Sequence, residues 1–152
     1  MNIDFDAIVR LHKSGRFAEL LTSCPPLNNK GTVSGNLRVM LAEASLFYGD
    51  LDTARMLAAP DVGQPQDKSI RPRLEVVLGL ASKDAGDFES AARHVHLAVR
   101  LASEIGEPCQ IAWCELNRFR LLINGGPESQ LVGNLASVRR CVTRAGDPHL
   151  TA

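Results

Sequence analysis

Residues 78–98 read LGLASKDAGDFESAARHVHLA, and this stretch decides the fold. On both sides of Gly86 apolar residues recur at three- and four-residue steps, which is typical of amphipathic helices. Glycine often ends a helix, and aspartate often begins one, so Gly86-Asp87 marks a tight corner. The stretch therefore predicts a helical hairpin. Similar corners occur at Gly49-Asp50-Leu51 and Gly15-Arg16-Phe17.

The composition is that of a single globular domain. The chain has 152 residues, of which 45% are hydrophobic and 5% aromatic, so its core is rich in small and aliphatic side chains. Lysine plus arginine and aspartate plus glutamate balance at 17 each. No net field therefore draws the chain to nucleic acid or to an anionic membrane, and we expect neither as a direct partner.

The sequence also favours a cytoplasmic location. Its first residues, MNIDFD, are acidic and lack the apolar segment of a secretory signal. The longest apolar runs, such as 76–81, fall far short of the roughly 20 residues of a membrane span. The four cysteines, which form no C-x-x-C pair, are predicted to be reduced and mostly buried. They are Cys24, Cys109, Cys114 and Cys141.

Helical periodicity runs through the whole chain, and glycine and proline interrupt it at regular intervals. Alternation typical of strands is nearly absent. We therefore predict an all-α fold of antiparallel helical hairpins. The predicted helices are 3–14, 16–23, 35–48, 51–59, 69–85, 88–105, 109–124 and 128–145. A polar surface connection is expected at 60–68, because its prolines and glycine prevent a helix.

The corners recur at a repeat period. The corner glycines at 15, 49, 86 and 125 are separated by 34, 37 and 39 residues, so each repeat holds two helices and a turn. We expect a single helical-repeat domain over 1–152. Its repeats cover about 1–30, 34–62, 69–106 and 108–146.

A second recurring motif lies between the repeats. Gly106-Glu107-Pro108 is followed at Ala112 by an alanine, and Gly146-Asp147-Pro148 is followed in the same register by Ala152. Glycine suits a helix end, proline suits the next first turn, and the acid favours that helix start. The chain thus stops as another repeat begins, and we interpret it as the N-terminal part of a longer protein.

These residues resemble the tetratricopeptide repeat family, in which a Leu-Gly pair, a Gly-Asp/aromatic corner and two alanines follow at fixed distances. The third repeat supplies all of them: Leu78-Gly79, Gly86-Asp87-Phe88, Ala91 and Ala98. The second supplies Leu41-Ala42, Gly49-Asp50-Leu51 and Ala54, with Asp61 in place of the last alanine. The first keeps only Gly15 and Phe17, and the fourth only its glycine corner and Pro127.

The resemblance implies a right-handed α-α superhelix of about eight helices. Small residues at Gly79, Ala91 and Ala98 agree with it, because they let two helices approach closely. Neighbouring hairpins must also stack to bury their apolar faces. An irregular helical bundle is the alternative. The long repeats, and the sequence over 92–108, are similar to repeats in large bacterial signalling proteins, including transcription activators and sensor kinases.

No pattern in the sequence predicts catalysis, a cofactor or a metal. His94 and His96 are two residues apart, so on a helix their rings point to opposite sides and cannot share a metal. Cys109 and Cys114 also lie on different faces. No nucleophile elbow, phosphate-binding loop or dinucleotide motif occurs. The paired carboxylates Asp4/Asp6 and Asp84/Asp87 are expected at helix ends as solvated caps.

The basic clusters are interpreted as solvated surface. They are Arg71-Pro72-Arg73 and the group Arg139, Arg140 and Arg144. A cation near a helix C-terminus, such as Arg144, is favourable in any case. The clusters are too small for a nucleic-acid footprint.

The family resemblance places a candidate protein-binding groove on the first helix of each hairpin. The candidate groove residues are Phe5, Val9, His12, Asn36, Val39, Glu43, Phe47, Arg73, Val76, Leu80 and Lys83. Phe5/Val9 and Val39/Glu43 occupy positions where chaperone-binding relatives carry lysine and asparagine, so binding of chaperone tails is disfavoured. A mixed apolar groove suits an amphipathic helix or an extended peptide. Some of these apolar residues are alternatively core.

The sequence therefore predicts a protein–protein interaction scaffold rather than an enzyme, within a bacterial regulatory or signalling protein. Its partner is a protein segment or a neighbouring domain of the same chain. The alternative is a small-molecule-sensing domain that uses the cavity of the solenoid. Self-association is also expected, through an uncovered stripe on helix 128–145. That stripe contains Leu131, Leu135, Val138 and Val142.

Overall fold

A computed structural model of the chain describes residues 4–24, 35–60, 67–123 and 128–146. These ranges contain eight α-helices and no strand, which confirms the all-α fold class. The helices lie within two residues of their predicted ends. They are α1 (Phe5–Lys13), α2 (Phe17–Ser23), α3 (Gly35–Tyr48), α4 (Leu51–Ala58), α5 (Arg71–Asp84), α6 (Phe88–Ile105), α7 (Pro108–Ile123) and α8 (Glu128–Ala145).

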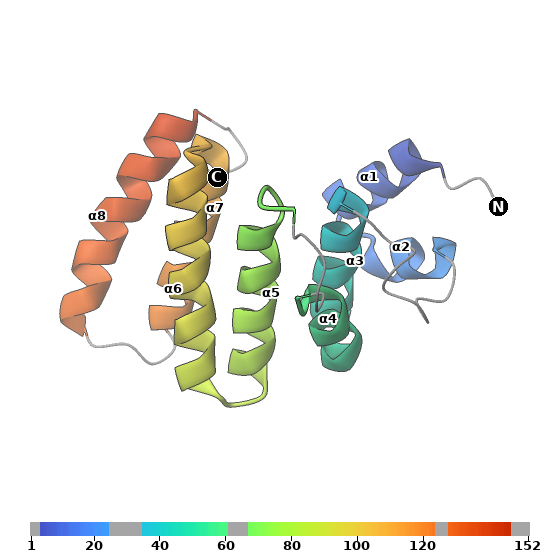
Figure 1. The fold of residues 1–152 in the computed structure, drawn as a ribbon, viewed down its shortest axis with the longest axis horizontal. Helices are drawn as coiled ribbons and strands as arrows, with labels where there is room; N and C mark the ends of the chain where they lie inside the picture. Colours follow the sequence, from blue (N-terminus) through green and yellow to red (C-terminus); the bar gives the residue numbers. More distant parts are fainter. Residues whose placement is uncertain (1–3, 25–34, 61–66, 124–127, 147–152) are drawn as a thin grey trace. The chain divides into compact units, whose positions relative to one another are not determined.

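The chain divides into two compact units, residues 1–65 with α1 to α4 and residues 66–152 with α5 to α8. In the first unit α1 and α2 pack together and both contact α3, which packs against α4 (Figure 1). In the second unit α5 and α6 pack together and both contact α7, which packs against α8. Within each unit, hairpin therefore packs on hairpin in chain order. The superhelix and the single repeat domain stay predictions.

Several predicted features lie outside the described residues. They are the fourth corner at Gly125 with Pro127, the position of Asp61, most of the connection at 60–68, the segment after Gly146, and the side chain of Leu131.

The corner at Gly86 forms as the sequence predicts. Gly86 adopts the left-handed conformation, with φ of 84°, which a residue with a Cβ rarely takes. The Asp87 amide donates to the carbonyl of Ser82 at 2.9 Å and so closes the end of α5. The Asp87 carboxylate in turn accepts from the Ser90 amide at 2.9 Å and begins α6. One residue pair thus ends one helix and starts the next.

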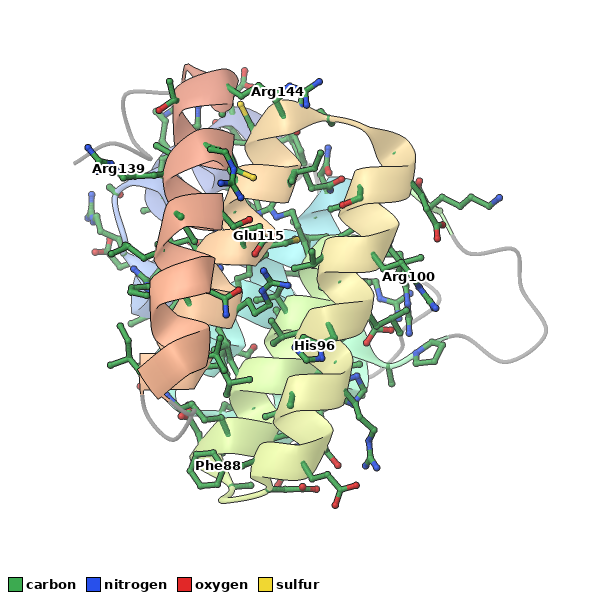
Figure 2. All side chains as sticks on the ribbon, turned by 90° about the vertical axis from the view of Figure 1, so that its left-hand side faces the viewer. Phe88, His96, Arg100, Glu115, Arg139 and Arg144 are labelled. Atoms are coloured by element: carbon green, nitrogen blue, oxygen red, sulfur yellow. The ribbon has the colours of Figure 1, made fainter. Side chains whose placement is uncertain are left out.

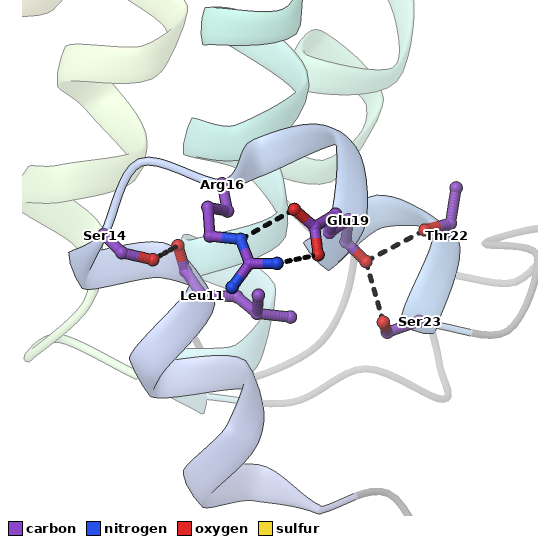
Figure 3. Close-up of polar contacts among 6 residues, drawn as sticks. All are labelled: Leu11, Ser14, Arg16, Glu19, Thr22 and Ser23. Carbon is purple, nitrogen blue, oxygen red and sulfur yellow. Dashed lines mark hydrogen bonds and ion pairs between the residues drawn. The ribbon is translucent and has the colours of Figure 1, made fainter.

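The other two corners repeat this backbone pattern with one difference. The Asp50 amide donates to the carbonyl of Ser45 at 2.9 Å, and the Arg16 amide donates to that of Leu11 at 3.0 Å. Asp50 also caps α4 through the Thr53 amide, at 3.0 Å. Arg16 has no acceptor with which to cap α2, and its Nε instead donates to Glu19 Oε1 at 2.6 Å (Figure 3).

Gly79 sets the approach of α5 to α6. A Cβ built at this position would lie 2.5 Å from Val95 Cγ2 and 3.1 Å from the Ala91 carbonyl oxygen. Ala91 and Val95 are themselves fully buried. The close packing predicted from Gly79 and Ala91 is therefore confirmed.

Two of the apolar clusters in the core of the second unit join different helices. The first joins three helices: Val76 from α5, Ala98 and Ala102 from α6, and Cys114 from α7, with Trp113 among the side chains packed on its edge. The second contains Ala91, Val95 and Leu121. Their buried members from α6 are small or β-branched, which fits the scarcity of aromatic residues.

In the first unit α3 is the most buried element. Nine consecutive residues, Arg38 to Leu46, are buried, so this helix exposes no face to solvent along that length. Arg38 is among them because its guanidinium donates to two carbonyl oxygens at the end of α4. These belong to Leu57 and Ala59, each at 2.5 Å. A buried cation is tolerable there because helix C-terminal carbonyls need donors.

The junction between α6 and α7 also follows the sequence prediction. Gly106 ends α6 with φ of 79°. The Glu107 carboxylate accepts from the amides of Cys109, at 3.1 Å, and Gln110, at 2.6 Å, at the start of α7. Gly146 likewise has a positive φ, of 63°, after α8.

Candidate functional site

The groove residues predicted in the first unit lie on α1 and α3. The structure brings two of them together: His12 Nε2 and Glu43 Oε2 are 2.7 Å apart. Glu43 is buried, whereas His12 is partly exposed. The pair therefore joins α1 to α3 and holds the imidazole in one orientation. Both residues belong to the predicted groove, but the sequence carries no signal for their contact.

An aromatic group surrounds this histidine. The ring of Phe17 stacks on Phe47, with centroids 5.1 Å apart, and meets the His12 ring edge-on at 5.9 Å. We call His12, Phe17 and Phe47 the aromatic patch. Phe47 remains 57% exposed, so its packing on Phe17 leaves most of its surface open. Phe17 was missing from the predicted groove because it begins the second helix of its hairpin, at the corner.

The remaining candidates of the first unit differ in exposure. Phe5 and Asn36 are exposed, and Val9 is partly buried. Val39 is fully buried and is not available to a partner, which agrees with the alternative that part of the apolar groove is core. Tyr48, directly after Phe47, is exposed and was not among the predicted residues.

In the second unit the predicted groove face of α5 is largely covered. Val76 is fully buried in the three-helix cluster, and Leu80 packs against the same cluster. The guanidinium of Arg73 lies 5.7 Å from the centroid of the Trp113 ring, in cation–π geometry. Lys83 forms an ion pair of 3.2 Å with the adjacent Asp84. The contacts of Val76, Leu80 and Arg73 join α5 to neighbouring helices, so α5 offers less free surface than the resemblance implies.

A buried carboxylate, Glu75, lies at the centre of the α5–α6 hairpin. It is 1% exposed, and its Oε2 lies 2.7 Å from His94 Nδ1 on α6. Arg71, one turn earlier on α5, forms an ion pair with its other oxygen. Glu75 was not among the predicted groove residues. The available signal was one glutamate inside the otherwise apolar run at 74–81.

A third buried glutamate occupies α7. Glu115 Oε2 lies 2.7 Å from Arg118 Nη2, and Ser137 from α8 donates to Glu115 Oε1 at 3.5 Å. Figure 2 labels Glu115 beside α8. The first helix of each of the last three hairpins therefore buries one carboxylate, in α3, α5 and α7, and each has a basic partner. Buried charges are retained only with such partners, so these glutamates have a structural explanation.

The two His–Glu pairs resemble a base oriented by a carboxylate, but catalysis needs a nucleophile beside the base. In the described ranges no hydroxyl or thiol is hydrogen-bonded to His12 or His94. The same residues also contain no group of three or more histidine, cysteine or acidic side chains able to hold a metal ion. His96 is exposed on α6 (Figure 2).

The cysteines are all free thiols. Burial, with a smaller contribution from the neighbouring Glu115 charge, raises the pKa of Cys114 to about 12. Burial also raises the pKa of Cys24. A thiol with a raised pKa is a poor nucleophile at neutral pH, so Cys114 is a packing residue.

None of the described helices combines the length and the apolar character needed to cross a membrane. Comparison with known proteins gives no match to any family model, curated protein or solved structure. Function is therefore inferred from the geometry of the described residues.

Proposed function

We propose that this chain is a protein–protein interaction scaffold built of helical hairpins, and that it acts as a module of a bacterial regulatory or signalling protein. The tetratricopeptide-like corners and the hairpin-on-hairpin packing within each unit support the scaffold class. The aromatic patch is the observation that carries the proposal, because it is an ordered, exposed anchor on the face predicted to bind.

Exposed aromatic side chains dominate the energetics of many protein interfaces. Phe47 is already fixed by its stacking on Phe17, and His12 is fixed by Glu43. Because these side chains are already fixed, this chain loses little conformational entropy when a partner covers Phe47. An amphipathic helix or extended peptide that inserts an apolar side chain beside Phe47 fits this geometry.

The regulatory context follows from the resemblance to repeats of large bacterial regulators. In such a module the bound segment is either a separate protein or a neighbouring domain of the same chain. A small-molecule sensor is the alternative function, and its distinguishing property is stabilisation by a metabolite.

The test is selection of binding sequences from a random peptide display library on the purified chain. We expect a recurrent peptide class with an apolar anchor, and the Phe47→Ala variant should weaken its affinity by about tenfold or more. Phe88→Ala is the matched control, because Phe88 is 52% exposed but belongs to the second unit. It should change affinity by less than about twofold.

Unfolding temperatures of both variants show whether the fold is kept. Failure to enrich any sequence class, or equal losses for Phe47→Ala and Phe88→Ala, would contradict the scaffold proposal. A thermal shift with one member of a metabolite panel, unaffected by Phe47→Ala, would favour the sensor instead.

A further inference from the structure

The second unit carries a strongly asymmetric charge distribution. The α7–α8 hairpin, residues 108–145, contains five arginines and two glutamates, whereas the α5–α6 hairpin, residues 71–105, contains five basic and five acidic residues. No acidic residue occurs between Glu128 and Asp147. Because the whole chain is neutral, the positive charge on α7–α8 is a local property of this hairpin.

Arg139, Arg140 and Arg144 of α8 differ from the other exposed arginines. Arg93 pairs with Glu89 at 3.0 Å and Arg100 with Glu104 at 4.0 Å, each one turn apart on α6. The three α8 arginines make no ion pair or hydrogen bond with any described residue. No described acidic side chain therefore neutralises their positive charge by direct contact.

An exposed apolar side chain borders the arginine side of α8. Successive residues turn by about 100°, which puts Arg139 and Arg140 about 100° and 160° around the helix from the buried Val138, and Leu135 between Val138 and Arg139, about 60° from Val138. Leu135 is 49% exposed and all three arginines are exposed. In Figure 2 Arg139 projects outward from α8, and Arg144 lies at the end of this helix.

The small exposed residues Gly133 and Ala136 lie on the same face. Apart from the adjacent backbone of α8 and the chain neighbours of Gly133, no atom of the described residues lies within 4 Å of where a Gly133 Cβ would be. A second helix can therefore approach α8 closely there while its side chains reach the arginines. We call the surface formed by Gly133, Ala136, Arg139, Arg140 and Arg144, with Leu135 at its edge next to Arg139, the α8 arginine face.

We infer that the α8 arginine face binds an acidic amphipathic helix of a protein partner. Carboxylates on successive turns of the partner reach Arg139 and Arg140, which lie about 100° apart around α8, and guanidinium groups bind carboxylates in bidentate geometry. An apolar residue of the partner covers Leu135, which lies about 40° from Arg139 on the side toward Val138. Nucleic acid fits less well, because three arginines neutralise few phosphates and Leu135 has no counterpart on a phosphate backbone.

This inference rests on the proposed scaffold function and adds the partner class for a second surface. It does not involve the aromatic patch, which belongs to the other unit.

The test uses a fluorescein-labelled helical peptide that has leucines on one face and glutamates four residues apart beside them. A second peptide replaces every glutamate with glutamine. By fluorescence anisotropy, the glutamate peptide should bind at least about tenfold more tightly than the glutamine peptide at low salt, and this preference should shrink as salt rises.

The double variant Arg139→Glu/Arg140→Glu should reduce the affinity for the glutamate peptide by about tenfold or more. Arg93→Glu is the matched control for charge reversal at an exposed arginine that already has a partner, and it should have an effect below about twofold. Leu135→Ala should weaken binding of both peptides, because it removes the shared apolar contact. Circular dichroism confirms that each variant is folded.

Equal affinity for the two peptides, or equal losses for the α8 and Arg93 variants, would overturn the inference. Tighter binding of a single-stranded oligonucleotide than of the glutamate peptide would assign the face to nucleic acid. Light scattering that shows a dimer lost in the double variant would assign it to a second copy of this chain. Phe47→Ala should leave binding of the glutamate peptide unchanged, so failure here is distinguishable from failure of the proposed function.

Discussion

Each of the two units buries a glutamate next to a histidine of another helix, but the two pairs connect different helices. In the second unit Glu75 meets His94 across a single hairpin, 19 residues away. In the first unit Glu43 meets His12 across two hairpins, 31 residues away. The same pair of residue types therefore closes one hairpin on itself and ties two successive hairpins together. The difference shows that a His–Glu pair marks a helix contact without saying which helices are in contact.

Removing the central carboxylate of the second unit should have the largest effect. Glu75→Ala leaves Arg71 and His94 without their shared acceptor, and breaking a buried ion pair costs about 3 kcal/mol or more. We expect the free energy of unfolding, measured by urea denaturation, to fall by about that amount. Glu89→Ala removes an exposed pair with Arg93 and should cost less than about 0.5 kcal/mol. Similar losses for the two variants would show that Glu75 has no special role.

The matching change in the first unit sharpens the comparison. Glu43→Ala should speed hydrogen exchange of the α1 amides, because α1 loses its link to α3. Glu75→Ala should speed exchange in α5 and α6 together. Uniform acceleration across both units in either variant would contradict this assignment of the two pairs.

A methyl group at Gly79 should produce the next largest effect. Gly79→Ala forces its Cβ against Val95 and the Ala91 carbonyl, and Val95 has one strongly preferred rotamer in a helix. We expect a loss of about 1–3 kcal/mol in the free energy of unfolding, despite the better helix propensity of alanine.

Gly133→Ala in α8 is the control for that propensity, because its Cβ would enter open space. It should stabilise the protein by up to about 1 kcal/mol. A stabilising Gly79→Ala variant would mean that α5 and α6 are less closely packed than described.

Removing the helix cap at the Asp50 corner should have the smallest effect on the free energy of unfolding, and this effect should depend on pH. Hydrogen bonds from the side chain and amide of Thr53 lower the pKa of Asp50 below its ordinary value of 3.8. A carboxyl whose folded-state pKa is lowered stabilises the fold above the ordinary value, and this stabilisation disappears as the pH falls through the lowered pKa. Asp50→Ala should therefore cost up to about 1 kcal/mol at pH 7 and almost nothing in strong acid.

Asp50→Asn separates the cap from the charge, since asparagine also caps helices. It should keep most of the stability at pH 7 and remove the part that varies in acid. At the first corner, where Arg16 cannot cap α2, Arg16→Ser creates a capping box with Glu19 and should raise the unfolding temperature slightly. A lower unfolding temperature would mean that the Arg16–Glu19 ion pair contributes more than a cap.

The exposure of aromatic residues shows where prediction from sequence ends. Phe17 and Phe88 occupy the same position in two corners, yet Phe17 stacks on Phe47 while Phe88 remains exposed. The corner motif specifies the turn through local backbone preferences. Whether its aromatic residue is covered depends on the side chain that the next hairpin brings to it.

The groove candidates show the same limit. The family resemblance placed Val39, Val76 and Phe47 on one predicted groove, but of these three only Phe47 is exposed. The face of a helix follows from its periodicity. Its burial depends on how closely the neighbouring helices approach, which Gly79 and the alanines of α6 control in the second unit.

By itself, the sequence determined the helices, their ends and the corners, because these depend on interactions within a few residues of the chain: glycine in the left-handed conformation, aspartate at a helix start and apolar periodicity. Only the tertiary structure decided which charged side chains are buried. Glu43, Glu75 and Glu115 look like ordinary helical glutamates in the sequence, and an arginine one turn away from Glu75 or Glu115 does not reveal that the carboxylate is covered. Burial is a property of contacts between helices, and no local pattern encodes it.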